Sequence, residues 1–411
     1  MAYKRLKYSM YRFLITATIF VLLGFVYLGH RLIVFQKPLA LRIAAWVFLG
    51  SMMANLLWLP FRRWQKQAHI FPTGRWGRFF ETNAYNAMGF LSLLLFFTAM
   101  SEFVRLAFGF STTEFMQTLE KKFLVGFNLE QILALVILSS SVVAFLWGRI
   151  KVWRGPQYRL VKLVYPLNGK AKRRPHFKKN KTASEKIRIV QVSDLHIGRA
   201  IQAVYVQNVV RKINALDADI LCFTGDIGDG KQSELKSAAA PLKNLKAKQG
   251  KFLIPGNHEY YWGLHTWLKE FADLQFTTLV NEGKLVTAQG KKIFIAGISD
   301  PVAARFGEAL PQIPQRKKSH FAVLLTHRPT FVKSALVYGY DLMLAGHTHG
   351  GQYIPWSWVA RMVYRFTSGL YRYKNLLVYV SDGTGYWGSP LRLGTRLEIT
   401  VFDIYINAQE G

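Results

Sequence analysis

The sequence has a single cysteine, Cys222, and few acidic residues. One cysteine cannot form an intrachain disulfide, which excludes a small secreted scaffold held together by disulfides and allows a reducing compartment. Asp and Glu number 23 against 54 Lys and Arg, and charged residues are only 19% of the 411. Hydrophobic residues make up 51%, which excludes an intrinsically disordered chain. A net charge of +31 on so apolar a chain points to an anionic membrane surface before a nucleic acid.

Four long apolar runs lie in the first 150 residues, at about 13–28, 39–60, 82–107 and 129–147. A helix needs about 20 predominantly apolar residues to cross a bilayer, and the third and fourth runs meet this best. A cleaved signal peptide is the alternative for the first run, but the following GHRLIVFQ contains no small-x-small cleavage site. The other alternative is that one or two runs are buried helices of a soluble domain. We expect residues 1–148 to form an α-helical transmembrane domain with four spans.

Lys and Arg are unevenly distributed around these runs. They gather before the first run, between the second and third, and after the fourth, whereas the other two loops are poorer in them. Because Lys- and Arg-rich loops stay in the cytoplasm, this asymmetry predicts a multi-pass protein with its N-terminus and its C-terminal half on the cytoplasmic side.

Residues 149–186 are expected to be a basic juxtamembrane connector. Their run AKRRPHFKKNK is dense in positive charge, and Phe177 is its only aromatic residue. Nucleic-acid binding by base stacking would require more aromatic residues. Attraction to anionic lipid is worth about 1 kcal/mol per Lys or Arg near the surface. The pattern therefore favours the anionic lipids of the inner leaflet as the partner, with a solvated linker as the alternative for its central part.

From residue 187 to 411 the pattern changes to that of an α/β domain. Short β-rich runs alternate with amphipathic helical stretches, which predicts a sheet covered on both faces. The predicted strands are IRIVQVSD, ADILCFTGD, KFLIPGN, KKIFIAGI, SHFAVLLTH, YDLMLAGH and RLEITVFDI.

Metal-ligating residue types stand where these strands end. They are Asp194, His196, Asp226, Asn257, His258, His327, His347 and His349. The carboxyl ends of strands meet at one edge of an α/β sheet, so these side chains are expected to converge. Imidazole, carboxylate and amide oxygen together suit Mn, Fe, Zn or Co better than Ca or Mg. Seven ligands among these eight residues would exceed the four of a structural zinc site, and one shared carboxylate would give two ions four ligands each.

The ordered motifs SDLH, TGD, PGNHE, TH and GHTHGGQ closely resemble those of the calcineurin-like metallophosphoesterases. The tail GTGYWGSPLRLGTRLEI resembles the membrane-associated bacterial branch, which includes phosphodiesterases and UDP-2,3-diacylglucosamine pyrophosphatase-like enzymes. The four runs resemble those of transmembrane proteins that carry a metallophosphoesterase domain. The resemblance implies a β-sandwich flanked by helices and a multi-pass protein of the cell inner membrane.

The resemblance also implies a role for each residue. Asp194, His196 and His349 would hold the first metal, Asn257, His327 and His347 the second, and Asp226 would bridge them. His258 would contact the phosphate together with Asn257 and act as the catalytic acid. The implied cofactors are two divalent ions, Mn first, with Zn, Fe and Co as alternatives.

These features predict a membrane-anchored hydrolase of a phosphodiester or pyrophosphate in a lipid-linked substrate, such as UDP-2,3-diacylglucosamine or a phospholipid. One alternative is a soluble phosphodiester or cyclic nucleotide substrate, or nuclease activity, although much of the positive charge lies outside the α/β domain. A non-catalytic membrane sensor or scaffold is the other, and the complete ligand set speaks against it.

Overall fold

The computed structural model describes residues 18–19, 22–33, 39–65, 75–107, 129–165, 186–316 and 320–406. These residues fall into two compact units. Unit 1 comprises residues 1–150 and 388–391, and unit 2 comprises residues 151–387 and 392–411. The basic run at 171–181, which was predicted to contact lipid, lies outside the described residues.

Unit 1 is helical. It contains α2 (Leu39–Gln65), α3 (Arg75–Ala107) and most of α5 (Leu129–Trp153). Within these helices, Leu39–Leu57, Phe79–Ala107 and Glu130–Trp153 are long and apolar enough to cross a membrane. Of the first predicted span, residues 18–19 and 22–32 are helical and the remainder lies outside the described residues, so a fourth span stays a prediction.

Polar side chains at the helix ends of unit 1 pair with one another. Arg31 contacts Glu102, and Arg105 lies 2.9 Å from Glu130. These pairs join the end of α3 to the start of α5 and to the first helical run.

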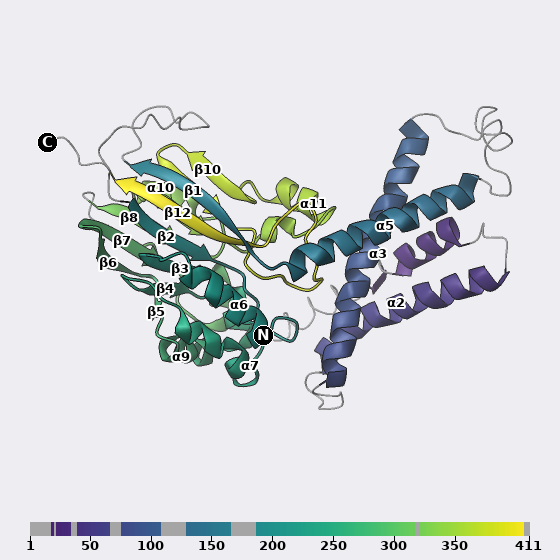
Figure 1. The fold of residues 1–411 in the computed structure, drawn as a ribbon, viewed down its shortest axis with the longest axis horizontal. Coiled ribbons are helices and arrows are strands. Elements are labelled where there is room, and N and C mark those ends of the chain that lie inside the picture. The colour runs from purple at the N-terminus through teal and green to yellow at the C-terminus, as the bar shows by residue number, and fades with distance from the viewer. Residues whose placement is uncertain are drawn as a thin grey trace. The chain divides into compact units, whose positions relative to one another are not determined.

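Unit 2 contains two six-stranded mixed sheets, in the orders β1-β12-β2-β3-β4-β5 and β10-β11-β9-β8-β7-β6 (Figure 1). The strands are β1 (Gln157–Tyr165), β2 (Lys186–Val192), β3 (Ile220–Thr224), β4 (Lys251–Ile254), β5 (Thr277–Thr278), β6 (Glu282–Ala288), β7 (Lys291–Gly297), β8 (Phe321–Leu325), β9 (Leu342–Ala345), β10 (Gly369–Tyr373), β11 (Leu376–Val380) and β12 (Glu398–Ile406). The helices are α6 (Ala203–Asn214), α7 (Gln232–Ala239), α8 (Asn257–Trp262), α9 (Leu264–Asp273), α10 (Val332–Val337) and α11 (Trp356–Val363), with 3-10 turns η1 (Ala240–Asn244), η2 (Pro301–Phe306) and η3 (His349–Gly351).

The core of unit 2 has three apolar layers because side chains alternate between the two faces of each strand. In β3, Ile220 and Cys222 face a layer shared with the second sheet, whereas Leu221 and Phe223 face the layer formed with α6, α7 and α9. A third layer covers the outer face of the second sheet and includes α10. All these strand positions are buried, which explains their continuous apolar runs. The predicted sandwich flanked by helices is confirmed.

Part of the segment expected to be a connector belongs to the sandwich. Residues 157–165 form β1, which pairs in parallel with β12 from Gln157↔Glu398 to Tyr165↔Ile406. Val161 and Leu163 are buried and join the layer between the sheets. The sheet therefore begins before the boundary that the sequence suggested.

The strand directions bring the predicted ligands to one edge. β2, β3 and β4 are parallel neighbours in the first sheet, as are β8 and β9 in the second. The loops that leave these five strands at their carboxyl ends carry the candidate site.

Candidate metal centre

The ligand loops are held in backbone conformations that non-glycine residues rarely adopt. Asp194, His196, Asp226, His347 and His349 all have positive φ angles, between 50° and 71°. Such conformations cost free energy, and they persist where the surrounding structure determines them. A side chain at Gly256 would place its Cβ 2.2 Å from Asp226 Oδ1, so only glycine lets these two loops meet. The loops are thus shaped for their side chains to converge.

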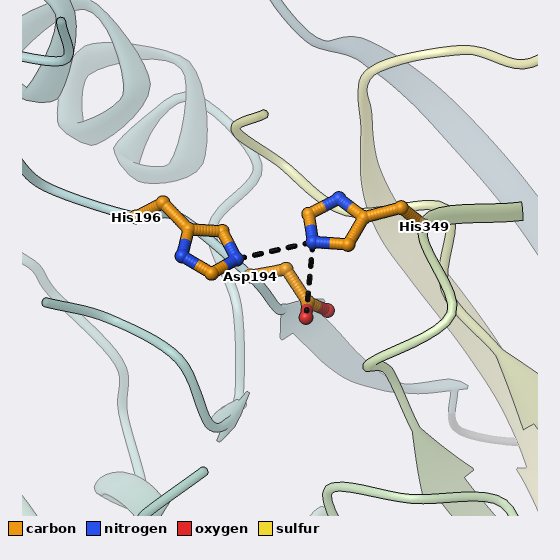
Figure 2. Close-up of side chains that lie close together, drawn as sticks. All are labelled: Asp194, His196 and His349. Atoms are coloured by element: carbon orange, nitrogen blue, oxygen red, sulfur yellow. Dashed lines mark hydrogen bonds and ion pairs between the residues drawn. The ribbon is translucent and has the colours of Figure 1, made fainter. Parts of the chain in front are cut away.

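Figure 2 shows Asp194, His196 and His349 pointing toward one another. The Nε2 atoms of His196 and His349 are 3.0 Å apart, and His349 Nε2 lies 3.6 Å from Asp194 Oδ1. The backbone N–H of His347 donates to Asp194, which ties the β9 loop to the β2 loop. One ligand atom from each of the three side chains lies within 4.8 Å of the others, a spacing suited to one metal ion.

A second group forms around Asp226. His327 Nε2 lies 3.2 Å from Asp226 Oδ2, 3.2 Å from His347 Nδ1 and 3.1 Å from Asn257 Oδ1. Asp226 Oδ2 also lies 3.8 Å from His196 Nε2, in the first group. The carboxylate of Asp226 therefore stands between the two groups, as the sequence-based interpretation expected of a shared ligand.

The donor set around His327 fits a divalent cation. The Nδ1 of His327 lies 2.8 Å from the carbonyl oxygen of Thr224, which only accepts hydrogen bonds, so this nitrogen carries a hydrogen. In the neutral ring Nε2 then presents a lone pair to two acceptor oxygens, those of Asp226 and Asn257. Burial opposes a charge on His327, but Asp226 raises its pKa to about 10. Without a metal ion, a proton on Nε2 therefore satisfies the surrounding acceptor oxygens. A metal ion would take the place of that proton.

The charge states of His196, His347 and Asp226 suit metal ligands. Burial lowers the pKa of His196 to about 4 and that of His347 to about 2, which keeps both imidazoles neutral. Burial opposes ionisation of Asp226, but His327 and His258 hold its pKa well below its usual range. Neutral imidazole and ionised carboxylate are the forms that bind metals.

His258 lies beside the ligands and is oriented by a residue that the sequence interpretation missed. Its Nδ1 is 2.9 Å from Asp229 Oδ1, and the indole N–H of Trp262 donates to the same oxygen. Because a carboxylate accepts, Nδ1 carries the hydrogen and Nε2 is left toward the site, 3.9 Å from Asp226 Oδ2. Burial opposes protonation, but Asp226 and Asp229 raise the pKa of His258 to about 9. Asp229 was visible in the sequence as the second acid of GDIGD.

Three further charged residues support the ligand loops. The carboxylate of Glu259 is fully buried and accepts hydrogen bonds from the backbone N–H groups of residues 226, 227, 228 and 256. Arg392 is also fully buried and donates to the carbonyl oxygen of His349. Arg328 is half-buried and donates to both Asp300 and Asn257. Of these three, Glu259 belongs to the PGNHE motif of the sequence.

Comparisons with known proteins agree with this geometry. The family model described as calcineurin-like phosphoesterase matches residues 187–351, which include all seven predicted ligands. An "Uncharacterized metallophosphoesterase" of Aquifex aeolicus is 32% identical over 232 residues, covering 53% of this chain and 85% of that protein. The chain belongs to the calcineurin-like metallophosphoesterase family. This family binds divalent metals, as the clustered His and Asp side chains would require.

Two further relatives each match about half of this metallophosphoesterase. An "Uncharacterized metallophosphoesterase" of Helicobacter pylori strain J99 is 35% identical over 221 residues, covering 52% of this chain and 59% of that protein. A "Transmembrane protein with metallophosphoesterase domain" of Bos taurus is 35% identical over 230 residues, covering 52% of each chain. The matches thus span little more than half the length of these two relatives.

Proposed function

We propose that the protein is a membrane-anchored, metal-dependent hydrolase that cleaves a phosphodiester or pyrophosphate in a lipid-linked substrate, such as UDP-2,3-diacylglucosamine or a phospholipid. The observation that carries the proposal is the position of Asp226, whose Oδ2 lies within 4 Å of both His196 and His327. One carboxylate shared by two ligand groups is the arrangement of a two-metal phosphoesterase.

The chain would divide the work of the reaction among its residues. Asp194, His196 and His349 would hold one ion, and Asn257, His327 and His347 the other, with Asp226 between them. When bound, such a pair of ions polarises phosphoryl oxygens and lowers the pKa of water. Asp229 fixes the ring of His258 through Nδ1, so that Nε2 can hold a proton for the oxygen of the leaving group. Arg328, beside Asn257, is placed to contact a phosphate.

Membrane anchoring is supported by the apolar helices of unit 1. Three described segments are long and apolar enough to cross a bilayer, and the bovine relative is described as a transmembrane protein. The Lys and Arg distribution favours a cytoplasmic catalytic domain, and the run at 171–181 favours anionic lipid beside it. We infer that the substrate lies in or at the inner leaflet.

Replacing Asp226 by Asn tests the site directly. Because groups that merely support metal ligands cost about 10- to 100-fold in affinity or activity when replaced, a shared ligand should cost more than about 100-fold. The measurement is turnover of bis-p-nitrophenyl phosphate with Mn²⁺ by the purified full chain, with metal content determined on the same sample.

Asp217→Asn is the matched control, because Asp217 has a nearly equal φ of 50° but is exposed and pairs with Lys248 at the surface. It should retain turnover and metal. Equal activity of the two variants, or a wild-type protein without metal and turnover, would contradict the proposal. A panel of a phospholipid, UDP-2,3-diacylglucosamine, a cyclic nucleotide and DNA then separates the lipid-linked substrate from the soluble alternatives.

A further inference from the structure

Helix α11 exposes large apolar side chains to solvent, and Ser357 is its one buried residue. Ser357 is 2% exposed, whereas Met362 is 86% and Val363 69% exposed. Trp356 and Val359 are each nearly half exposed on the same face. A helix that served only to cover the domain would be oriented the other way, and contiguous apolar patches on a surface mark sites of interaction.

The sequence around α11 carries charge of one sign. Between Asp341 and Asp382 the sequence contains no acidic residue, and it carries Arg361, Arg365, Arg372 and Lys374. Arg361 lies within α11, beside the exposed apolar residues. Tryptophan, aliphatic side chains and arginine on one short helix are the composition of helices that lie at the boundary between lipid headgroups and acyl chains.

The helix is joined to the metal centre at both ends. It begins five residues after the end of η3, which contains His349, and a Cβ on Gly351 would lie 2.4 Å from the Cα of Ser357. At its other end the ring of Tyr364 lies 6.3 Å from the ring of His347. Whatever α11 contacts is therefore brought close to the ligands on the β9 loop.

We propose that the exposed face of α11, formed by Trp356, Val359, Met362 and Val363, inserts into the surface of a bilayer containing anionic phospholipid. A second copy of the chain fits this face less well. A symmetric contact would bring Arg361 near its own counterpart, and the segment has no acidic residue to pair with it. This proposal has one consequence that rests on the proposed function. If the protein is a phosphoesterase, the phosphoester that it cleaves belongs to a lipid headgroup at the membrane surface.

The single buried cysteine makes a labelling experiment practical. Cys222 is 0% exposed, so a cysteine introduced at Met362 can carry a bimane probe selectively. The full chain is reconstituted in vesicles of phosphatidylcholine and phosphatidylglycerol. Val337→Cys in α10 is the matched control, because Val337 is an equally exposed apolar residue, at 81%. Thermal unfolding of both labelled variants checks that they fold like the wild type.

The probe at position 362 should show blue-shifted emission, strong quenching by lipids with brominated acyl chains and weak quenching by aqueous iodide. The probe at position 337 should show the reverse. Iodide quenching at 362 equal to that at 337 would overturn the proposal, and so would shielding from both quenchers, which would indicate a second copy or another protein. Vesicles of phosphatidylcholine alone should reduce the quenching by brominated lipid at 362. Unchanged quenching would overturn the proposed preference for anionic phospholipid.

The readout requires no turnover, so the two proposals can fail separately. A probe buried in lipid on a protein that hydrolyses nothing would refute the proposed function alone. A protein that hydrolyses bis-p-nitrophenyl phosphate with the probe in water would refute the role of α11 alone.

Discussion

Two neighbouring regions after strand β9 depart from the usual division between apolar core and polar surface, in opposite directions. The ligand loop places His349 against a cluster of buried polar groups, with left-handed backbone at both of its histidines. A few residues later, α11 leaves Met362 and Val363 in solvent. Each arrangement costs free energy in an isolated domain, because buried charge needs partners and exposed apolar area is hydrated.

The difference shows which kind of contact each region needs to offset this cost. The ligand edge requires a partner inside the protein, and it has one for most of its charges: Asp226 lies among His196, His258 and His327. For the exposed face of α11 we propose a partner outside the chain. Local departures from folding rules are expected at functional sites, and here one points to a cation and the other to a membrane.

Outside the metal ligands themselves, the largest effect should come from His258→Ala at the buried edge. We expect turnover to fall by about 10²- to 10⁴-fold, the usual contribution of a general acid, while metal content stays at the wild-type level. The measurement is turnover and metal analysis on one preparation. His265→Ala is the control, since the His265 side chain is 80% exposed and pairs with Glu308, and it should leave both quantities unchanged. Loss of metal in the His258 variant would instead make this residue a ligand.

A smaller effect is expected from Asp229→Asn, which removes the carboxylate that orients His258. Groups that orient metal-binding imidazoles typically contribute about 10- to 100-fold, and we expect a loss of this order here. Because Asp229 acts through the ring, kcat should fall while KM changes little, and the double variant with His258→Ala should be no slower than His258→Ala alone. Multiplied losses in the double variant would show that Asp229 acts independently of His258.

The sequence was most informative where a strand pattern and a ligand type coincide. Asp194, Asp226, His327 and His347 each follow a mostly buried strand within two residues, and parallel strands bring their ends to one edge. What the pattern could not supply is which charged residues outside the motifs are buried. Arg392 is fully buried in a loop rich in Gly, Ser and Arg, and such a loop has no hydrophobic periodicity from which burial could be predicted.

Strand β1 was hidden for a different reason. Its buried Val161 and Leu163 alternate with the exposed Leu160 and Lys162, which is the period of a strand with one solvated face. Nearby positions are basic, and the strand directly follows a long apolar helix, so the composition indicated a connector instead. The order β1-β12-β2 depends on pairing over more than 200 residues, which no local pattern specifies.

The smallest effect should arise where the two regions meet, at Gly351. Its φ of +76° favours glycine, and a Cβ there would also meet the carbonyl oxygen of Trp356 at 2.5 Å. Gly307 has nearly the same φ, +74°, but nothing within 4 Å of its Cβ position. Gly307→Ala should therefore cost only the backbone strain, about 1 kcal/mol, whereas Gly351→Ala should cost about 1–3 kcal/mol more because backbone atoms must move.

Thermal unfolding of the two variants measures this difference, and the bimane probe at position 362 measures its consequence. If α11 and the ligand loop form one rigid joint, Gly351→Ala should reduce both turnover and quenching by brominated lipid, and Gly307→Ala neither. Reduced stability with normal turnover and normal quenching would mean that the loop and helix adjust independently. In that case the packing of the sandwich alone would hold the buried ligands in their strained backbone conformations. Contact between α11 and lipid would then not position the metal centre.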